Sequence, residues 1–163
     1  AMEAAPTARR AGWLPPSPLR DAHFSGPSKA SLEEKYKNAL PYRHLQVDGL
    51  CRPDAMAKVR EECLELPRTY RETDLFKIYQ TIDLSNVSLD SDLARSMPTL
   101  MSLRVHLYSE GFRSFLQEVT GCGPLTARVD CSFNVYQRGC HLLCHDDAIS
   151  TRKVSYIIYL SDD

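Results

Sequence analysis

Apolar residues recur at helical spacing through the first two thirds of the chain, and this pattern predicts four helices. Ser31 and Glu34 form a capping box at the start of the first helix, and Pro53 stands where the second begins. Pro98 limits or kinks the third helix, because proline lacks the backbone N–H that a helix interior needs. Residues 74–90 have no clean period and predict no element. The predicted helices cover residues 31–40, 53–66, 92–108 and 110–120.

Apolar and polar residues alternate strictly over residues 128–136, which predicts a strand with two different faces. The apolar positions are Val129, Cys131, Phe133 and Val135, and the polar ones are Asp130, Ser132, Asn134 and Tyr136. Two further strands are predicted at 140–144 and 153–160, the latter rich in β-branched and aromatic residues, and a short one at 45–50. Helices followed by strands predict an α+β fold, with the helices packed on an antiparallel sheet.

Residues 1–28 hold five of the ten prolines, and their arginines outnumber their acidic residues. Such a segment buries too little apolar surface to offset its ordering entropy, so we predict a disordered leader, with an organelle transit sequence as the alternative. The folded domain is predicted over residues 29–163, in line with one domain for 163 residues. Because a sheet with so few predicted strands needs partners, we expect the polypeptide to continue beyond residue 163.

The charge balance is close to neutral, with 20 Lys and Arg against 21 Asp and Glu. This excludes a strongly basic protein that binds nucleic acid through phosphate neutralisation alone. No apolar run reaches 18 residues, so no membrane-spanning helix is predicted. Six cysteines are too few for a disulfide scaffold, which favours reduced thiols in a reducing compartment.

The stretch Leu-Leu-Cys-His-Asp-Asp at residues 142–147 carries the candidate chemistry. His145 and Asp147 are two residues apart, so in an extended chain both side chains project from the same face. One imidazole and one carboxylate are two of the three ligands of a facial triad, which binds ferrous iron and leaves positions open for substrate and dioxygen. Tyr136, on the polar face of its strand, and Tyr159, on the last strand, flank this pair in the sequence.

Two other interpretations of the same stretch remain open. Zinc could be bound by the cluster Cys140, His141, Cys144 and His145. No second cysteine pair follows, however, and in an extended chain the cysteines point opposite to the histidines. The simplest alternative is that His145 is a satisfied polar group and Asp147 a turn former.

The stretch VDCSFNVYQRGCHLLCHDDAISTRKVSYIIYL, residues 129–160, resembles the catalytic domain of the 2-oxoglutarate- and iron-dependent ribosomal prolyl hydroxylases. These eukaryotic enzymes hydroxylate a proline of a small-subunit ribosomal protein at the decoding centre. The Leu-Leu-Cys-His-Asp-Asp core is highly specific for this family, and RETDLFKIYQTIDL at 71–84 resembles an upstream segment more loosely. The resemblance covers about residues 30–163.

The resemblance implies a double-stranded β-helix, or jelly-roll, oxygenase core with supporting N-terminal helices, of which residues 29–163 are the first part. It implies that His145 and Asp147 are iron ligands, that Asp146 is a spacer, and that Tyr136 and Tyr159 bind 2-oxoglutarate. The family's distal iron histidine and its 2-oxoglutarate-binding arginine lie much further along. No histidine follows His145 in this sequence, and Arg152 is too close to His145 to be that arginine.

The activity implied is hydroxylation of a prolyl residue coupled to decarboxylation of 2-oxoglutarate to succinate and CO2, with Fe(II) as cofactor and ascorbate as a supporting reductant. The implied partners are a small-subunit ribosomal protein and dioxygen, with no direct nucleic-acid contact and no membrane, in the cytoplasm or nucleus. Two alternatives stay open. One is an oxygenase of the same fold that acts on another substrate such as nucleic acid, and the other is a non-catalytic protein-binding module.

Overall fold

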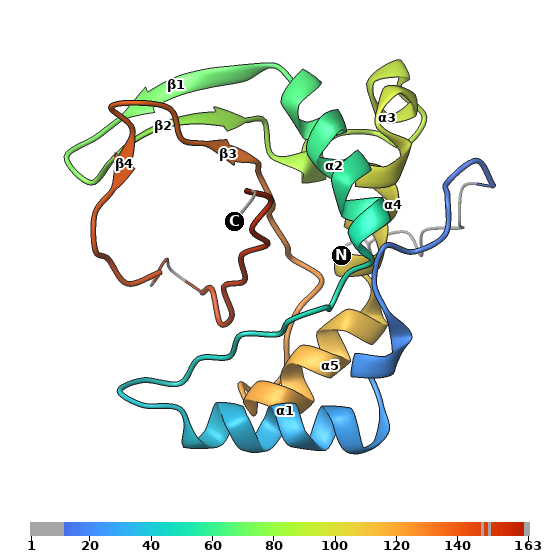
Figure 1. Ribbon diagram of the computed structural model, residues 1–163, viewed down its shortest axis with the longest axis vertical. Coiled ribbons are helices and arrows are strands. Elements are labelled where there is room, and N and C mark those ends of the chain that lie inside the picture. The colour runs from blue at the N-terminus through green and yellow to red at the C-terminus, as the bar shows by residue number, and fades with distance from the viewer. Residues whose placement is uncertain (1–11, 148, 150, 162–163) are drawn as a thin grey trace, which may run out of the picture.

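The computed structural model describes residues 12–147, 149 and 151–161. Helices form the first two thirds of this part, and extended segments with a small sheet form the rest (Figure 1). The helices are η1 Asp21–His23, α1 Gly26–Asn38, α2 Pro53–Glu65, η2 Leu84–Asn86, α3 Asp92–Ser96, α4 Pro98–Leu107 and α5 Glu110–Thr120. The strands are β1 Arg68–Glu72, β2 Phe76–Thr81, β3 Asn134–Val135 and β4 His141–Leu142. Helices with an antiparallel sheet are the coarse class that the sequence predicted.

Side-chain caps mark the starts of α3 and α5. The Ser109 hydroxyl accepts a hydrogen bond from the backbone N–H of Phe112 at the start of α5, and Gly121 ends this helix in the left-handed conformation. The single helix predicted over 92–108 is two helices, because Met97 leaves helical geometry just before Pro98. The first helix starts at Gly26 rather than at residue 31, and its early proline is compatible with a first turn.

The hydrophobic core lies between α2, α4 and α5. Met101 on α4 has 0% relative exposure, and Val59 and Cys63 on α2 have 1% and 2%. The buried Arg104 guanidinium donates hydrogen bonds to the carbonyl oxygens of Leu84 and Val87, at 2.6 and 2.5 Å. Those bonds satisfy the charged group inside the core and tie η2 to α4. No helix in the described part of the chain combines the length and apolar character needed to cross a bilayer.

Residues 12–28 differ from the disordered leader expected over 1–28, of which residues 1–11 lie outside the described range. Leu19 is 7% exposed and belongs to the core. The backbone N–H of Arg52 donates to the Pro18 carbonyl oxygen at 2.8 Å, and the Ser102 hydroxyl donates to that of Pro15 at 2.9 Å. Prolines lack N–H donors but keep their carbonyls, so this segment is held by donors from the helical region. The predicted strand at 45–50 is not formed, and a single bridge joins Leu19 to Cys51 instead.

β2 is the centre of the small antiparallel sheet. β1 pairs with one edge of β2 as a hairpin, in register Tyr70 with Tyr79. β3 and β4 pair with opposite ends of the other edge, so residues 136–140 loop out between them. The irregular pattern at 74–90 gave no sign of this hairpin.

The extended segments keep the alternation that the sequence predicted. Val129, Cys131, Phe133 and Val135 are half-buried, and the four polar residues between them are exposed. In residues 153–160, Val154, Tyr156, Ile158 and Leu160 are half-buried in the same way. The Tyr156 ring lies edge-on to Phe112 of α5, with centroids 5.6 Å apart. The predicted strands are therefore extended with the correct faces, but only 134–135 and 141–142 have strand partners among the described residues.

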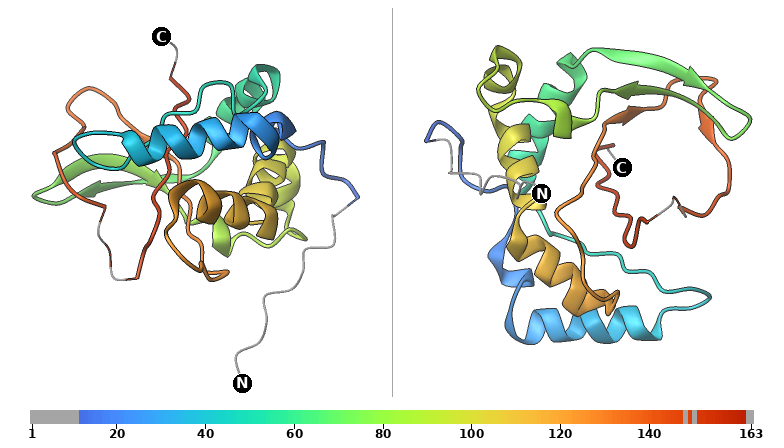
Figure 2. Two further views of the ribbon diagram at one scale, coloured as in Figure 1. Left: turned by 90° about the horizontal axis from the view of Figure 1, so that it is seen from below. Right: turned by 180° about the vertical axis from the view of Figure 1, so that it is seen from behind.

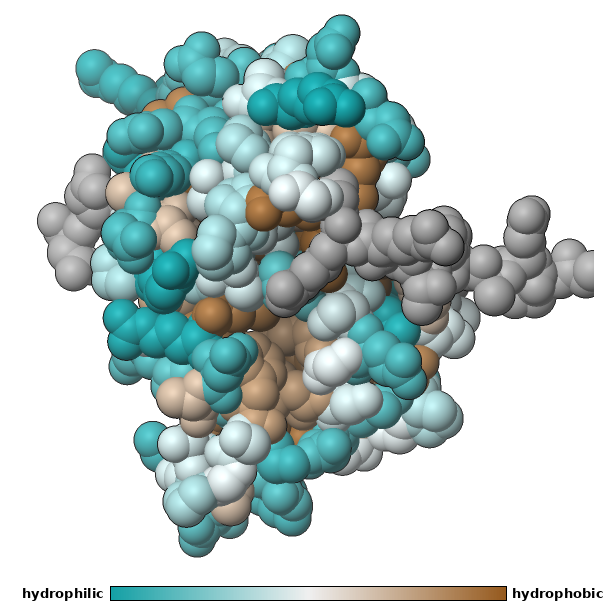
Figure 3. Space-filling view, turned by 90° about the vertical axis from the view of Figure 1, so that its right-hand side faces the viewer, coloured by the Kyte–Doolittle hydropathy of each residue, from teal (hydrophilic) through white to brown (hydrophobic). Residues whose placement is uncertain are grey.

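The two sides of the molecule differ. Seen from the helical side, hydrophilic residues cover most of the surface around an apolar hollow (Figure 3). On the other side, the sheet and the chain after β4 curve around the last extended segment (Figures 1 and 2). The exposed faces of 128–136 and 153–160 point away from the helices, since their other faces pack on the helical core. We call these exposed faces the open face.

Candidate metal centre

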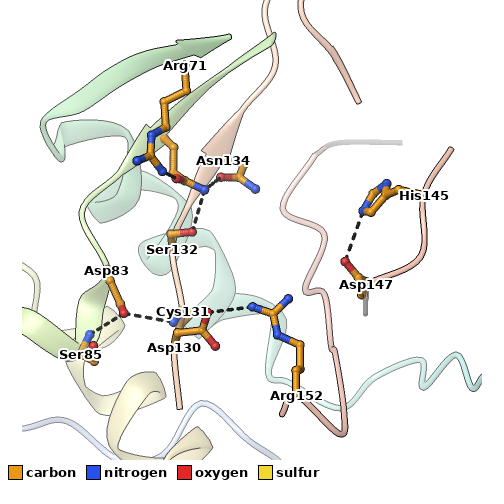
Figure 4. Close-up of polar contacts among 11 residues, drawn as sticks. Arg71, Asp83, Ser85, Asp130, Cys131, Ser132, Asn134, His145, Asp147 and Arg152 are labelled. Atoms are coloured by element: carbon orange, nitrogen blue, oxygen red, sulfur yellow. Dashed lines mark hydrogen bonds and ion pairs between the residues drawn. The ribbon is translucent and has the colours of Figure 1, made fainter. Parts of the chain in front are cut away.

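His145 and Asp147 lie on the extended segment that follows β4, and their side chains face each other (Figure 4). A hydrogen bond from the backbone N–H of Leu143 to the Leu75 carbonyl oxygen, at 2.9 Å, fixes the start of this segment. His145 Nε2 is 3.2 Å from Asp147 Oδ1, and His145 Nδ1 is 2.8 Å from the Leu143 carbonyl oxygen. The spacing of two residues thus brings both side chains to one side, as an extended chain requires.

The local electrostatics favour a cationic charge at this pair. The hydrogen bond to the Leu143 carbonyl raises the pKa of His145, and the Asp147 and Asp146 carboxylates add to this increase. The side chains of His145 and Asp147 are 28% and 47% exposed, so ligands can reach them from solvent. With Nδ1–H held by the Leu143 carbonyl, Nε2 is the nitrogen that is presented next to the carboxylate.

The donor set suits a divalent metal with nitrogen and oxygen ligands, and the described residues provide two such donors here. Within the described residues, no group of three or more His, Cys, Asp and Glu side chains could hold a metal ion. The four residues of the zinc alternative are therefore not assembled into a site, and Cys140 is half-buried while Cys144 is exposed. An imidazole and a carboxylate with open positions match the iron chemistry better than a closed zinc site.

Tyr136 and Tyr159 both have exposed rings on the open face, 49% and 81% exposed. Tyr136 begins the 136–140 loop-out, and Tyr159 comes from the last extended segment. Partial burial raises the pKa of Tyr136, and the nearby Tyr159 phenol adds to this increase. Two phenol groups from different extended segments are therefore close enough for one to influence the pKa of the other.

Sequence reasoning missed a polar row that crosses the sheet from β1 to the segment containing β3 (Figure 4). The Arg71 guanidinium donates to Gln80 Oε1 at 2.5 Å. The Gln80 side-chain amide donates to Ser132 Oγ at 3.2 Å and to Asn134 Oδ1 at 3.0 Å. The alternation over 128–136 placed Ser132 and Asn134 on a polar face, but nothing in the sequence paired them with the hairpin.

Arg152 and Asp130 form an ion pair at 2.9 Å on the same side of the molecule. This contact ties the start of the last extended segment to the start of the segment that contains β3. Asp83 completes the anchoring, because its Oδ1 accepts hydrogen bonds from the backbone N–H groups of Cys131 and Ser85, at 3.2 and 2.9 Å. Arg152 is thus a structural partner of Asp130.

Comparison with known protein families finds a match over the last part of the chain. Residues 131–163 match the model of the 2OG-Fe(II) oxygenase superfamily. The matched segment contains β3, β4, the His145–Asp147 pair and both candidate tyrosines.

The individual relatives are prolyl hydroxylases. The chain is 57% identical over 107 residues to Prolyl 3,4-dihydroxylase OGFOD1 of Ostreococcus tauri, covering 62% of this chain and 21% of the relative. It is 31% identical over 121 residues to Prolyl 3-hydroxylase OGFOD1 of Mus musculus, covering 74% and 20%. The resemblance to prolyl hydroxylases is confirmed. The chain spans about a fifth of the length of these curated relatives.

Proposed function

We propose that this chain is part of a 2-oxoglutarate- and Fe(II)-dependent dioxygenase that hydroxylates a prolyl residue of a small-subunit ribosomal protein. The observation that carries the proposal is the His145–Asp147 pair, with Nε2 and Oδ1 3.2 Å apart, inside the segment that matches the oxygenase superfamily. The names of the relatives support a prolyl substrate. The ribosomal substrate rests on the resemblance of residues 129–160.

The proposed fold is a double-stranded β-helix, with residues 12–161 forming its supporting helices and first strands. Two extended segments, 128–136 and 153–160, support this proposal, because each covers the helices with one face and presents the other to solvent. A double-stranded β-helix needs such two-faced strands, one side against its support and the other lining the site. Its further strands would pair with the backbone of 153–160, which forms no strand within the described residues.

In the proposed site, His145 Nε2 and an Asp147 carboxylate oxygen hold iron. When bound, iron and 2-oxoglutarate supply the oxidising chemistry, and the protein orients the reactants and excludes water. The Leu143 carbonyl holds the Nδ1 proton of His145 and so keeps Nε2 available. The Tyr136 and Tyr159 hydroxyls donate hydrogen bonds to a carboxylate of 2-oxoglutarate, since an anion near an apolar surface needs donors.

In the overall reaction, the two oxygen atoms of dioxygen go to two different products. One oxygen atom of dioxygen enters the C–H bond of the prolyl ring as a hydroxyl, and the other enters the succinate formed when 2-oxoglutarate loses CO2. The near-neutral net charge of −1 favours a protein substrate over nucleic acid. We propose the cytoplasm or nucleus as the location, with ascorbate as a supporting reductant.

The test is an anaerobic titration of the full-length protein with Fe(II) and 2-oxoglutarate, following the visible charge-transfer band of the ternary complex. His145→Ala should abolish the band, because it removes one of the two ligands. Asp146→Ala is the matched control, since the spacer carboxylate is adjacent in sequence but holds no iron in this proposal. A band of full intensity in His145→Ala would contradict the site.

Two further outcomes separate the alternatives. A folded wild-type protein that shows no band would be a binding module rather than an oxygenase. For an active protein, succinate release is measured with a proline-containing ribosomal peptide and, in parallel, with an alkylated oligonucleotide. Release that depends on the oligonucleotide alone would overturn the prolyl substrate.

A further inference from the structure

The polar row across the sheet has a fixed direction. Arg71 can only donate hydrogen bonds, so the Gln80 atom that faces it at 2.5 Å must be the carbonyl oxygen Oε1. The Gln80 amide nitrogen must then face the other way, where it donates to both Ser132 Oγ and Asn134 Oδ1. The positive charge of Arg71 strengthens this series of bonds, because each donor polarises the next.

This direction determines how the Asn134 side chain is presented. Its carbonyl oxygen is occupied by Gln80, so its own amide nitrogen is turned away from Gln80. In Figure 4 that nitrogen points toward the side of the molecule on which His145 lies. Asn134 is two residues before Tyr136, so both are on the open face. The open face therefore carries an oriented N–H donor beside the Tyr136 phenol.

The orientation matters for an anionic ligand. A free asparagine amide can turn by half a rotation and present either its N–H group or its carbonyl oxygen. A carboxylate is attracted by the N–H group and repelled by the carbonyl oxygen. A carboxylate ligand therefore binds less tightly to a site whose amide can rotate freely. Arg71 and Gln80 remove the unfavourable orientation before the ligand arrives, which is preorganisation.

We propose that Arg71 and Gln80 are positioning residues that hold the Asn134 amide as a hydrogen-bond donor to a carboxylate of the dicarboxylic acid cosubstrate. The inference rests on the proposed function, because that function supplies the dicarboxylic acid. Arg71 and Gln80 do not touch the ligand. They belong to the β1–β2 hairpin, which thereby contributes to a site whose other residues lie more than 50 positions later in the chain.

The test measures the dissociation constant of 2-oxoglutarate by anaerobic calorimetry on the Fe(II)-loaded full-length protein. Gln80→Glu keeps the contact to Arg71 but can only accept hydrogen bonds, so it reverses the Asn134 amide and turns the carbonyl oxygen toward the ligand. We expect binding about thirtyfold weaker, the loss of one hydrogen bond to a charged group plus the repulsion. Gln80→Met leaves the amide free to rotate and should weaken binding about fivefold.

The charge-matched control is Tyr70→Glu, which adds the same charge to the exposed strand β1 but on the face opposite to Arg71 and Gln80, outside the polar row. It should bind 2-oxoglutarate within about twofold of wild type. In turnover assays, Gln80→Glu should raise the KM for 2-oxoglutarate and leave kcat at saturation nearly unchanged. A merely structural role would lower thermal stability without this separation. If Gln80→Glu does not fold, Arg71→Met should reproduce the effect of Gln80→Met.

The outcomes distinguish the two proposals. A wild-type protein that binds no 2-oxoglutarate would overturn the proposed function itself. A wild type that binds 2-oxoglutarate while Gln80→Glu binds equally tightly would overturn only the positioning role. Equal weakening by Tyr70→Glu and Gln80→Glu would also overturn it, because charge alone would then explain the loss.

Discussion

The helical region, residues 12–120, and the extended region, residues 124–161, satisfy their polar backbone groups in different ways. The helices satisfy theirs locally, and their ends are covered by nearby side chains such as Ser91 and Ser109. The extended segments need a neighbouring strand, and among the described residues only two short stretches of this region, β3 and β4, have one. The helical region therefore has a closed core, whereas the extended region has one covered face and one open face.

This difference separates stability from chemistry along the chain. The most buried apolar side chains, such as Met101 and Val59, belong to helices. All four candidate ligands and cosubstrate contacts lie in the extended region, on residues that are exposed. Substitutions at buried positions of the helices should therefore act through the free energy of unfolding. Those on the open face, and those in the Arg71–Gln80 polar row that contacts it, should act through binding.

The largest stability effect is expected from Met101→Ala. Met101 has 0% exposure, so its truncation leaves a cavity that costs about 3 kcal/mol of unfolding free energy. The matched substitution is Ile157→Ala on the open face, where the side chain is 67% exposed and the cost should stay below about 0.5 kcal/mol. Urea denaturation of the 163-residue chain measures both. Equal losses would mean that the extended region has a closed core of its own.

Glu62→Ala should have a smaller effect on the same quantity. The Glu62 carboxylate accepts hydrogen bonds from the backbone N–H groups of Thr99 and Leu100, at 3.0 and 2.6 Å, at the start of α4. Met97, the residue before this helix, provides no side-chain cap, so Glu62 acts as the cap from α2. Its loss should cost about 2 kcal/mol.

Glu61→Ala is the matched control for this capping bond, because Glu61 is the exposed neighbour on the same helix. It should change the unfolding free energy by less than about 0.5 kcal/mol. Comparable losses in the two variants would assign the effect to helix charge rather than to the cap of α4.

Local signals in the sequence were sufficient to predict where most of the longer helices begin and end. Pro53 and the apolar spacing after it gave α2 to within a residue, and Gly121 marked the end of α5. A limit or kink at Pro98 was predicted within one helix, and the structure has a full break into α3 and α4 there, since proline acts on its own backbone and the preceding residue. The β1–β2 hairpin was missed because β1 is exposed along its whole length and so has no apolar alternation.

The candidate site likewise contains local contacts that the sequence predicts and long-range contacts that it does not. The His145–Asp147 contact is local, and the extended chain alone puts both side chains on one face. Gln80 bonds to residues 52 and 54 positions away, and such a contact depends on strand register. The leader expectation failed over residues 12–28 for a related reason. The composition of a segment indicates how much apolar surface it can bury by itself. Leu19, however, is buried against helices that come later in the chain.

The mildest perturbation that distinguishes the helical core from the open face is the alkylation of single cysteine thiols. Burial raises the pKa of Cys63 to about 12 and that of Cys131 to about 11, and nearby negative groups add to both increases. Only the thiolate reacts with iodoacetamide, so at pH 8 these two thiols are almost entirely unreactive. Cys144, next to His145, is exposed and should be alkylated first, at least a hundredfold faster than Cys63. Peptide mass spectrometry over a time course measures each rate.

In strong denaturant all three thiols should react alike, because their differences come from the fold. Cys63 alkylated as fast as Cys144 in the native protein would mean that the helical core opens as readily as the open face, and the separation between the regions would be lost.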